Sequence, residues 1–69
     1  MSEDEFLGKL GARIKELRLK KSISQKDLAM KCNFEKASMS RIESGKTNIT
    51  ILTLNKIVIA LNADIRDLF

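Results

Sequence analysis

The stretch that decides the fold is SQKDLAMKCNFEKASMSRIESGK, residues 24–46. Ser24 precedes a short run with helical spacing, so its hydroxyl is expected to cap a helix over about residues 25–32. Asn33 suits the left-handed conformation that turns a chain sharply. A second helix is expected over about residues 36–44. The stretch therefore predicts two short helices that cross at a steep angle.

Apolar residues on one face of each helix identify the sides that pack inward. Gly45 is suited to the position just after the end of the second helix, and Phe34 is expected to anchor the turn between the two helices. The inward residues expected from the spacing are Leu28, Ala29, Cys32, Met39 and Ile42.

Outward from this stretch the same helical period recurs on both sides. A helix over about residues 5–21 carries the stripe Phe6, Leu10, Ile14 and Leu17, and one over about residues 51–61 carries Leu54, Ile57 and Leu61. Asn48 or Thr50 is expected to cap the latter. Asp64 is expected to cap a final helical turn over residues 65–69, with Asp67 completing a capping box. The fold class predicted is all-α, a compact domain of five helices.

Composition sets the domain organisation and excludes several classes of protein. The chain of 69 residues allows one domain, taken as residues 6–69 after an acidic tail at residues 1–5. Cys32 is the single cysteine and there is no histidine, so neither an internal disulfide nor a zinc site is expected. No apolar run approaches the roughly 20 residues that span a bilayer, and the acidic start is unlike a secretory signal. We expect a cytoplasmic protein without membrane contact, metal or cofactor.

The charge is concentrated in the folded part. The net charge is +4, but Glu3, Asp4 and Glu5 precede the domain, and from Phe6 onward thirteen basic residues face six acidic ones. Such an excess on a small domain favours a polyanionic partner such as nucleic acid.

Two motifs at fixed spacing carry a family resemblance. The segment SQKDLA at residues 24–29 and the segment SRIESGK at residues 40–46, preceded by RIKELR at residues 13–18, resemble the lambda-repressor/Cro-like, or XRE-like, helix-turn-helix family. The resemblance covers nearly the whole chain. It implies a transcription regulator that binds double-stranded DNA with the helix at residues 36–44 in the major groove.

The residues themselves agree with this role. With Met39 and Ile42 inward, one outer ridge of the helix carries Lys36, Ser40 and Ser44, and the ridge beside it carries Ala37 and Arg41. Short side chains let a helix approach the groove closely, and Arg or Lys can donate to guanine N7 and O6. By resemblance, the residues at base-reading positions are Lys36, Ala37, Ser40 and Arg41, and those near phosphates are Ser38 and Ser44.

Contacts with the sugar-phosphate backbone are expected at both ends of the stretch. Gln25 opens the first helix, where an amide and free backbone N–H groups suit a phosphate. The resemblance implies the same role for Gln25, and a backbone grip for Lys46, Thr47 and Asn48. It also implies a partly buried ion pair between Arg18 and Glu43, which would be architectural.

The sequence departs from the family pattern in three places. Glu35 stands where Ser or Thr usually caps the recognition helix, and its charge would repel a nearby phosphate. Ser22 replaces the usual Gly between the first two helices, and Ile49 stands where proline is frequent.

A second apolar face suggests self-association. Leu52 and Ile59 are spaced seven residues apart, off the core stripe of their helix, and Ile65, Leu68 and Phe69 follow. We expect a homodimer through this region that binds a short palindrome, because twofold helix-turn-helix pairs read half-sites one helical turn apart. The alternative interpretation is that these residues cover the end of a small core.

Three other functions remain open. The segment NITI at residues 48–51 is similar to segments of single-domain restriction-modification controllers, and an antitoxin-type autoregulator is a related alternative. A protein-interaction module that has kept the fold is another, although Lys36 and Arg41 argue against it. An enzyme is not expected, because the chain has no His, Tyr or Trp and Cys32 lies on an apolar helix face, which leaves a Ser–Lys pair as the one remaining, improbable combination of nucleophile and base. No small-molecule effector site is evident.

Overall fold

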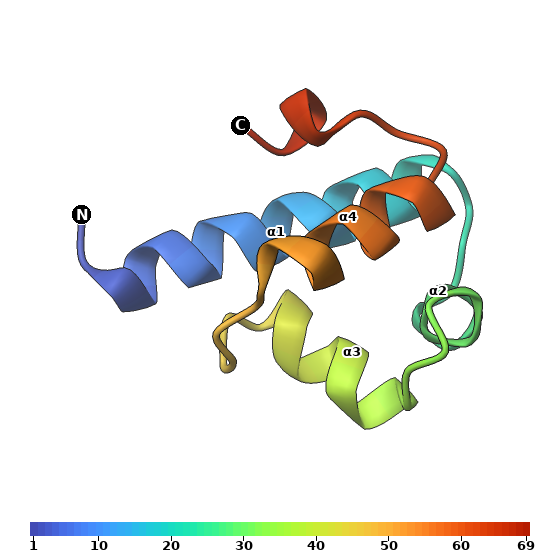
Figure 1. Cartoon of the computed structure of the whole chain (residues 1–69), viewed down its shortest axis with the longest axis horizontal. Coiled ribbons are helices and arrows are strands. Elements are labelled where there is room, and N and C mark those ends of the chain that lie inside the picture. The colour runs from blue at the N-terminus through green and yellow to red at the C-terminus, as the bar shows by residue number, and fades with distance from the viewer.

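A computed structural model describes all 69 residues and contains only helices (Figure 1). The α-helices are α1 (Glu3–Lys20), α2 (Gln25–Lys31), α3 (Lys36–Glu43) and α4 (Ile51–Ala60), followed by the 3₁₀ turn η1 (Ile65–Leu68). The all-helical architecture is as expected, but the count of five helices is wrong, because the last element is one 3₁₀ turn rather than an α-helix. None of the helices has the length and apolarity needed to cross a membrane.

The helix starts follow from side-chain caps. Ser2, Ser24 and Thr50 each accept a hydrogen bond from the backbone N–H three residues further on, at 3.0–3.1 Å. Thr50, rather than Asn48, therefore caps α4. The cap at Ser2 also starts α1 at Glu3 instead of the expected Glu5, so the three acidic residues form its first turn and interact favourably with the helix dipole.

The capping box expected at the last turn is present. The Asp64 carboxylate accepts from the backbone N–H of Arg66, while Asp67 accepts from the backbone N–H of Asp64, both at 2.9 Å. The hydrogen bonds from the backbone and side chain of Arg66 lower the pKa of Asp64. These local bonds define a compact C-terminal turn.

All four α-helices end in the same way. The residue after each C-cap is left-handed, with φ of 56° at Ser22, 60° at Asn33, 73° at Gly45 and 52° at Asn62. In each case the following N–H donates to a carbonyl five residues earlier, as from Phe34 to Ala29 at 2.8 Å. These are Schellman motifs, which satisfy carbonyls that a helix end leaves free.

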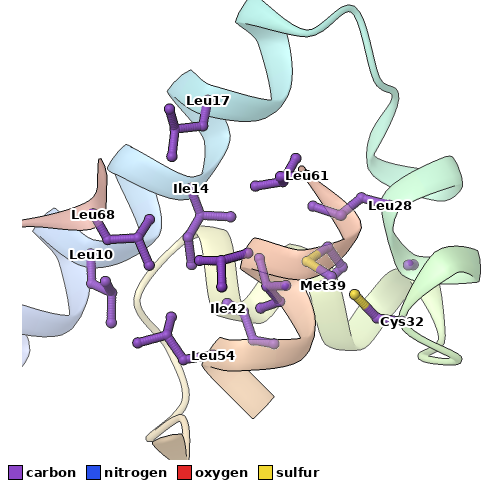
Figure 2. Close-up of a cluster of buried hydrophobic side chains, with 13 residues drawn as sticks. Leu10, Ile14, Leu17, Leu28, Cys32, Met39, Ile42, Leu54, Leu61 and Leu68 are labelled. Atoms are coloured by element: carbon purple, nitrogen blue, oxygen red, sulfur yellow. The ribbon is translucent and has the colours of Figure 1, made fainter. Parts of the chain in front are cut away.

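One core of 13 buried side chains holds the elements together (Figure 2). The inward residues expected from the spacing are buried, with one exception. Phe6 is 47% exposed and stacks on Phe69. Leu68, in contrast, was expected in the dimerisation region but is buried in the core at 6% exposed. Because η1 folds back over α1, the core extends to the end of the chain.

Glycines let α3 approach α1 at backbone distance. A Cβ on Gly11 would lie 2.5 Å from the Glu43 carbonyl oxygen, and one on Gly45 would lie 2.7 Å from Gly8 Cα. Both separations are shorter than side chains tolerate. The C-terminal end of α3 and the turn after it therefore rest directly on the backbone of α1.

Candidate nucleic-acid interface

The outer edge of α3 is the centre of the candidate interface. Met39 is fully buried and Ile42 is 9% exposed, so these two side chains fix the rotation of the helix. The opposite side consists of exposed residues that nothing else in the chain covers, and we call it the recognition edge: Lys36, Ala37, Ser40, Arg41 and Ser44. Figure 1 shows α3 at the side of the molecule opposite the C-terminal turn. The edge is thus cationic, narrow and accessible.

The start of α3 has no side-chain cap. Glu35 occupies the N-cap position and makes no capping hydrogen bond, as its residue type suggested. The N–H groups of the first turn therefore remain available to an external acceptor.

The segment after α3 lies beside the recognition edge. Lys46 and Asn48 are exposed, Thr47 is partly exposed, and the three residues form what we call the backbone loop. Its two last residues line a hollow together with Ser38 and Arg41. No carboxylate lies within ion-pairing distance of Lys46. Arg41, expected at a base, thus shares one hollow with Ser38, Thr47 and Asn48, which are expected near phosphates.

The Ser44 hydroxyl already makes hydrogen bonds within its own helix. Its hydroxyl donates to the Ser40 carbonyl at 2.9 Å and also lies near the Arg41 carbonyl. The oxygen still has free lone pairs and is exposed, but in this geometry its proton is committed to the end of α3.

The expected ion pair between Arg18 and Glu43 is present and buried. Arg18 Nε donates to Glu43 Oε2 at 2.7 Å and its Nη2 donates to Oε1 at 3.0 Å, with side chains 8% and 3% exposed. Arg18 Nη1 also donates to the Ile23 carbonyl at 3.0 Å. The hydrogen bond to Glu43 raises the pKa of Arg18 above its usual value. The pair therefore ties α1, the α1–α2 turn and α3 together.

Gln25 joins this network, which the sequence did not indicate. Its Nε2 donates to Glu43 Oε1 at 3.2 Å, and the side chain is partly buried. An amide nitrogen carries two hydrogens, so one remains for an outside acceptor. The N-terminus of α2 is thereby held against the C-terminal end of α3.

Cys32 does not resemble a reactive thiol. The residue is 4% exposed, and burial raises the pKa of its thiol. Since the thiolate is the nucleophilic form, the residue acts as a small apolar member of the core.

The residues expected at a dimer interface are exposed, and we call Leu52, Ile59, Ile65 and Phe69 the dimer patch. Leu52 is 78% exposed and Ile59 is 68% exposed, both on the outer face of α4. Phe69 stacks on Phe6 at a ring-centroid distance of 6.2 Å and lines a groove with Ile51. Ile51 was not singled out from the sequence, although it is 71% exposed.

Comparisons with known proteins agree with this geometry. A family model described as helix-turn-helix matches residues 14–68. The chain is 36% identical over 59 residues to control protein C.BamHI of Bacillus amyloliquefaciens, covering 84% of this chain and 73% of that protein. It is 32% identical over 62 residues to control protein C.MunI of a Mycoplasma species, covering 88% and 84%.

A solved structure extends the similarity to three dimensions. The restriction-modification controller protein C.AhdI from Aeromonas hydrophila superposes with a TM-score of 0.87 at 33% identity, covering 91% of this chain and 96% of that one. The similarity in fold thus extends over most of both chains.

Proposed function

The chain belongs to the helix-turn-helix family of DNA-binding regulators, and from this we propose that it is a controller-type transcription regulator that binds a palindromic operator as a homodimer. The observation that carries the proposal is the recognition edge. A helix whose exposed side chains are short or cationic fits the major groove, where guanine presents two acceptors.

Each part of the interface has a separate role in this proposal. Arg41 and Lys36 donate to base edges, and the methyl group of Ala37 contacts a thymine methyl. Gln25 offers its free amide hydrogen to a phosphate while its other hydrogen stays on Glu43. The backbone loop grips the phosphates that follow. These backbone contacts set the register of α3 without reading sequence.

Dimerisation is supported by the position of the dimer patch. Figure 1 places the C-terminal turn, which carries Ile65 of the patch, on the side of the molecule away from α3, so pairing through this turn leaves both recognition edges free. The longest dimension of one copy is 30 Å, comparable with the roughly 34 Å between half-sites one helical turn apart. Two copies side by side are therefore of the right size for adjacent major grooves.

The controller role is supported by the extent of the similarity. The relatives named as control proteins match along most of the chain, and C.AhdI is a restriction-modification controller by name. If this chain has the same role, the operator selected from randomised duplexes should occur upstream of its own gene, in the neighbourhood of genes for a restriction enzyme and a methyltransferase. Its absence there would favour a regulator of other genes.

Two alanine substitutions separate base reading from backbone grip. Arg41→Ala should cost about 1–3 kcal/mol on the selected operator and remove the preference at one base pair of each half-site. Lys46→Ala should weaken all duplexes alike and reduce the slope of log K against log salt by about 0.9 per lost phosphate contact. Anisotropy titrations at several salt concentrations measure both effects. Equal losses for the two variants on every sequence would contradict the assigned roles.

The dimer patch is tested by adding charge to it. The double change Leu52→Glu with Ile59→Glu should give a monomer in sedimentation equilibrium, because two carboxylates would be buried against their copies. The matched control is Ala12→Glu with Leu19→Glu, which adds the same charge to exposed positions on the outer face of α1. An unchanged mass for the first pair would rule out this patch.

A further inference from the structure

The first two turns of α1 lie directly beside the backbone loop. Gly45 precedes the loop and touches Gly8 at backbone distance, since a Cβ on Gly45 would lie 2.7 Å from Gly8 Cα. One turn further along α1, Gly11 meets the carbonyls at the end of α3 in the same way. The N-terminal part of α1 is therefore fixed against the loop by contacts that leave little room for movement.

This contact places an acidic side chain next to the proposed phosphate grip. Asp4 is four residues before Gly8 and so lies on the same face of α1. It lines one hollow together with Ser44, Lys46, Thr47 and Asn48. Glu5, its neighbour in the same turn, points about 100° away around the helix and lines none of the hollows described. Of these two adjacent acids, only Asp4 faces the loop.

The charge of Asp4 is not neutralised by an ion pair. The ion pairs in the molecule join Arg13 with Glu16, Arg18 with Glu43, and Arg66 with Asp64. Neither Asp4 nor Lys46 therefore takes part in an ion pair. A phosphate bound by the loop would therefore meet the attraction of Lys46 and the repulsion of Asp4 together. At low salt this repulsion is felt over the Debye length of about 10 Å or more, and it is screened as salt rises.

We propose that Asp4 is an affinity-limiting residue, which weakens the hold of the backbone loop on DNA phosphates through like-charge repulsion. The inference rests on the proposed function, because it assumes that the loop approaches a phosphate. The repulsion acts on the DNA backbone, so Asp4 lowers the affinity for every duplex without changing which bases are preferred. In a twofold complex the repulsion acts once in each half-site, so the fold-change in affinity for one half-site is squared for the whole operator.

The test compares Asp4→Asn with Glu5→Gln, which remove the same charge from the same helical turn. On the selected operator at about 50 mM salt, Asp4→Asn should tighten binding about 3- to 10-fold, with a similar gain on a scrambled duplex. Glu5→Gln should tighten it less than about 2-fold, because its charge acts from further away. Asp4→Lys should increase the affinity more than Asp4→Asn does, and the increase in affinity for every variant should be smaller at about 200 mM salt. Circular dichroism melts check that each variant is folded.

The outcomes distinguish this inference from the proposed function. Equal gains for Asp4→Asn and Glu5→Gln would show an effect of net charge alone and would overturn the inference. Unchanged or weaker binding by Asp4→Asn would also overturn it, the latter by indicating that the carboxylate supports the loop or binds a bridging cation. Failure of the unchanged protein to bind any duplex at low salt would instead refute the proposed function.

Discussion

Replacing Glu43 with alanine is expected to lower the free energy of unfolding by about 3–5 kcal/mol, the usual cost of removing one partner from a buried ion pair. Arg18 would keep its charge in a site where its side chain is 8% exposed. Gln25 would lose the acceptor that holds it at 3.2 Å. Because small domains have only about 5–15 kcal/mol of stability, the variant should be close to unfolded at 37 °C.

Urea denaturation followed by circular dichroism measures this loss. The matched control is Glu16→Ala, which breaks the ion pair with Arg13 at the surface, where the side chains are 33% and 58% exposed. An exposed pair contributes about 0–1 kcal/mol, so the control should unfold almost like the unchanged protein. Similar unfolding midpoints for the two variants would show that the buried network is not what holds α3 in place.

Gly11→Ala is expected to destabilise the protein by about 1–3 kcal/mol or more, the range seen when a tightly packed site is overfilled. The sign is opposite to that of a Gly→Ala change in an exposed helix, which stabilises by about 1 kcal/mol. The added methyl would lie 2.5 Å from the Glu43 carbonyl oxygen and would push the end of α3 away from α1. DNA binding should fall with stability, because the same displacement tilts the recognition edge.

Gly8→Ala supplies the control for this prediction. It lies in the same helix, and a Cβ there would meet nothing within 4 Å. It should therefore raise the unfolding free energy by about 0.5–1 kcal/mol through the ordinary helix preference for alanine. Thermal melts of both variants measure this difference. A change in melting temperature of the same sign in both variants would mean that α3 does not pack against Gly11.

Local chemistry made most of the fold predictable. The period of apolar residues located the four α-helices, and hydroxyl caps at Ser24 and Thr50 marked two of the starts. The left-handed turns at Asn33 and Gly45 were expected from residue type. Those at Ser22 and Asn62 were not, since serine rarely adopts this conformation and Asn62 stands between Leu61 and Ala63 without a glycine or proline nearby.

The features of the fold that could not be predicted from the sequence depend on contacts between segments that are distant along the chain. Phe6 fits the helical stripe of α1, but the stripe runs past the end of the core, and there Phe6 stays 47% exposed and stacks on Phe69. The last element, Ile65–Leu68, is a single 3₁₀ turn with a capping box, and its residue types did not distinguish this turn from a short α-helix.

The candidate site also has features that could be predicted from the sequence and features that could not. The recognition edge followed from helical geometry, and the ion pair of Arg18 with Glu43 followed from the family resemblance. The bond from Gln25 to Glu43 and the position of Asp4 beside the backbone loop had no local signal. The glycines at positions 8 and 11 offered a hint, because two glycines inside a charged helix suggest close packing against another backbone.

The placement of α3 in the major groove is tested most directly by methylation interference on the selected operator. Methyl groups on guanine N7 lie in the major groove, whereas those on adenine N3 lie in the minor groove. We predict that N7 methylation of a guanine in each half-site abolishes binding and that Arg41→Ala removes this sensitivity, while N3 methylation near the same positions has little effect. Interference confined to adenine N3, or none at any purine, would contradict a recognition edge that reads the major groove.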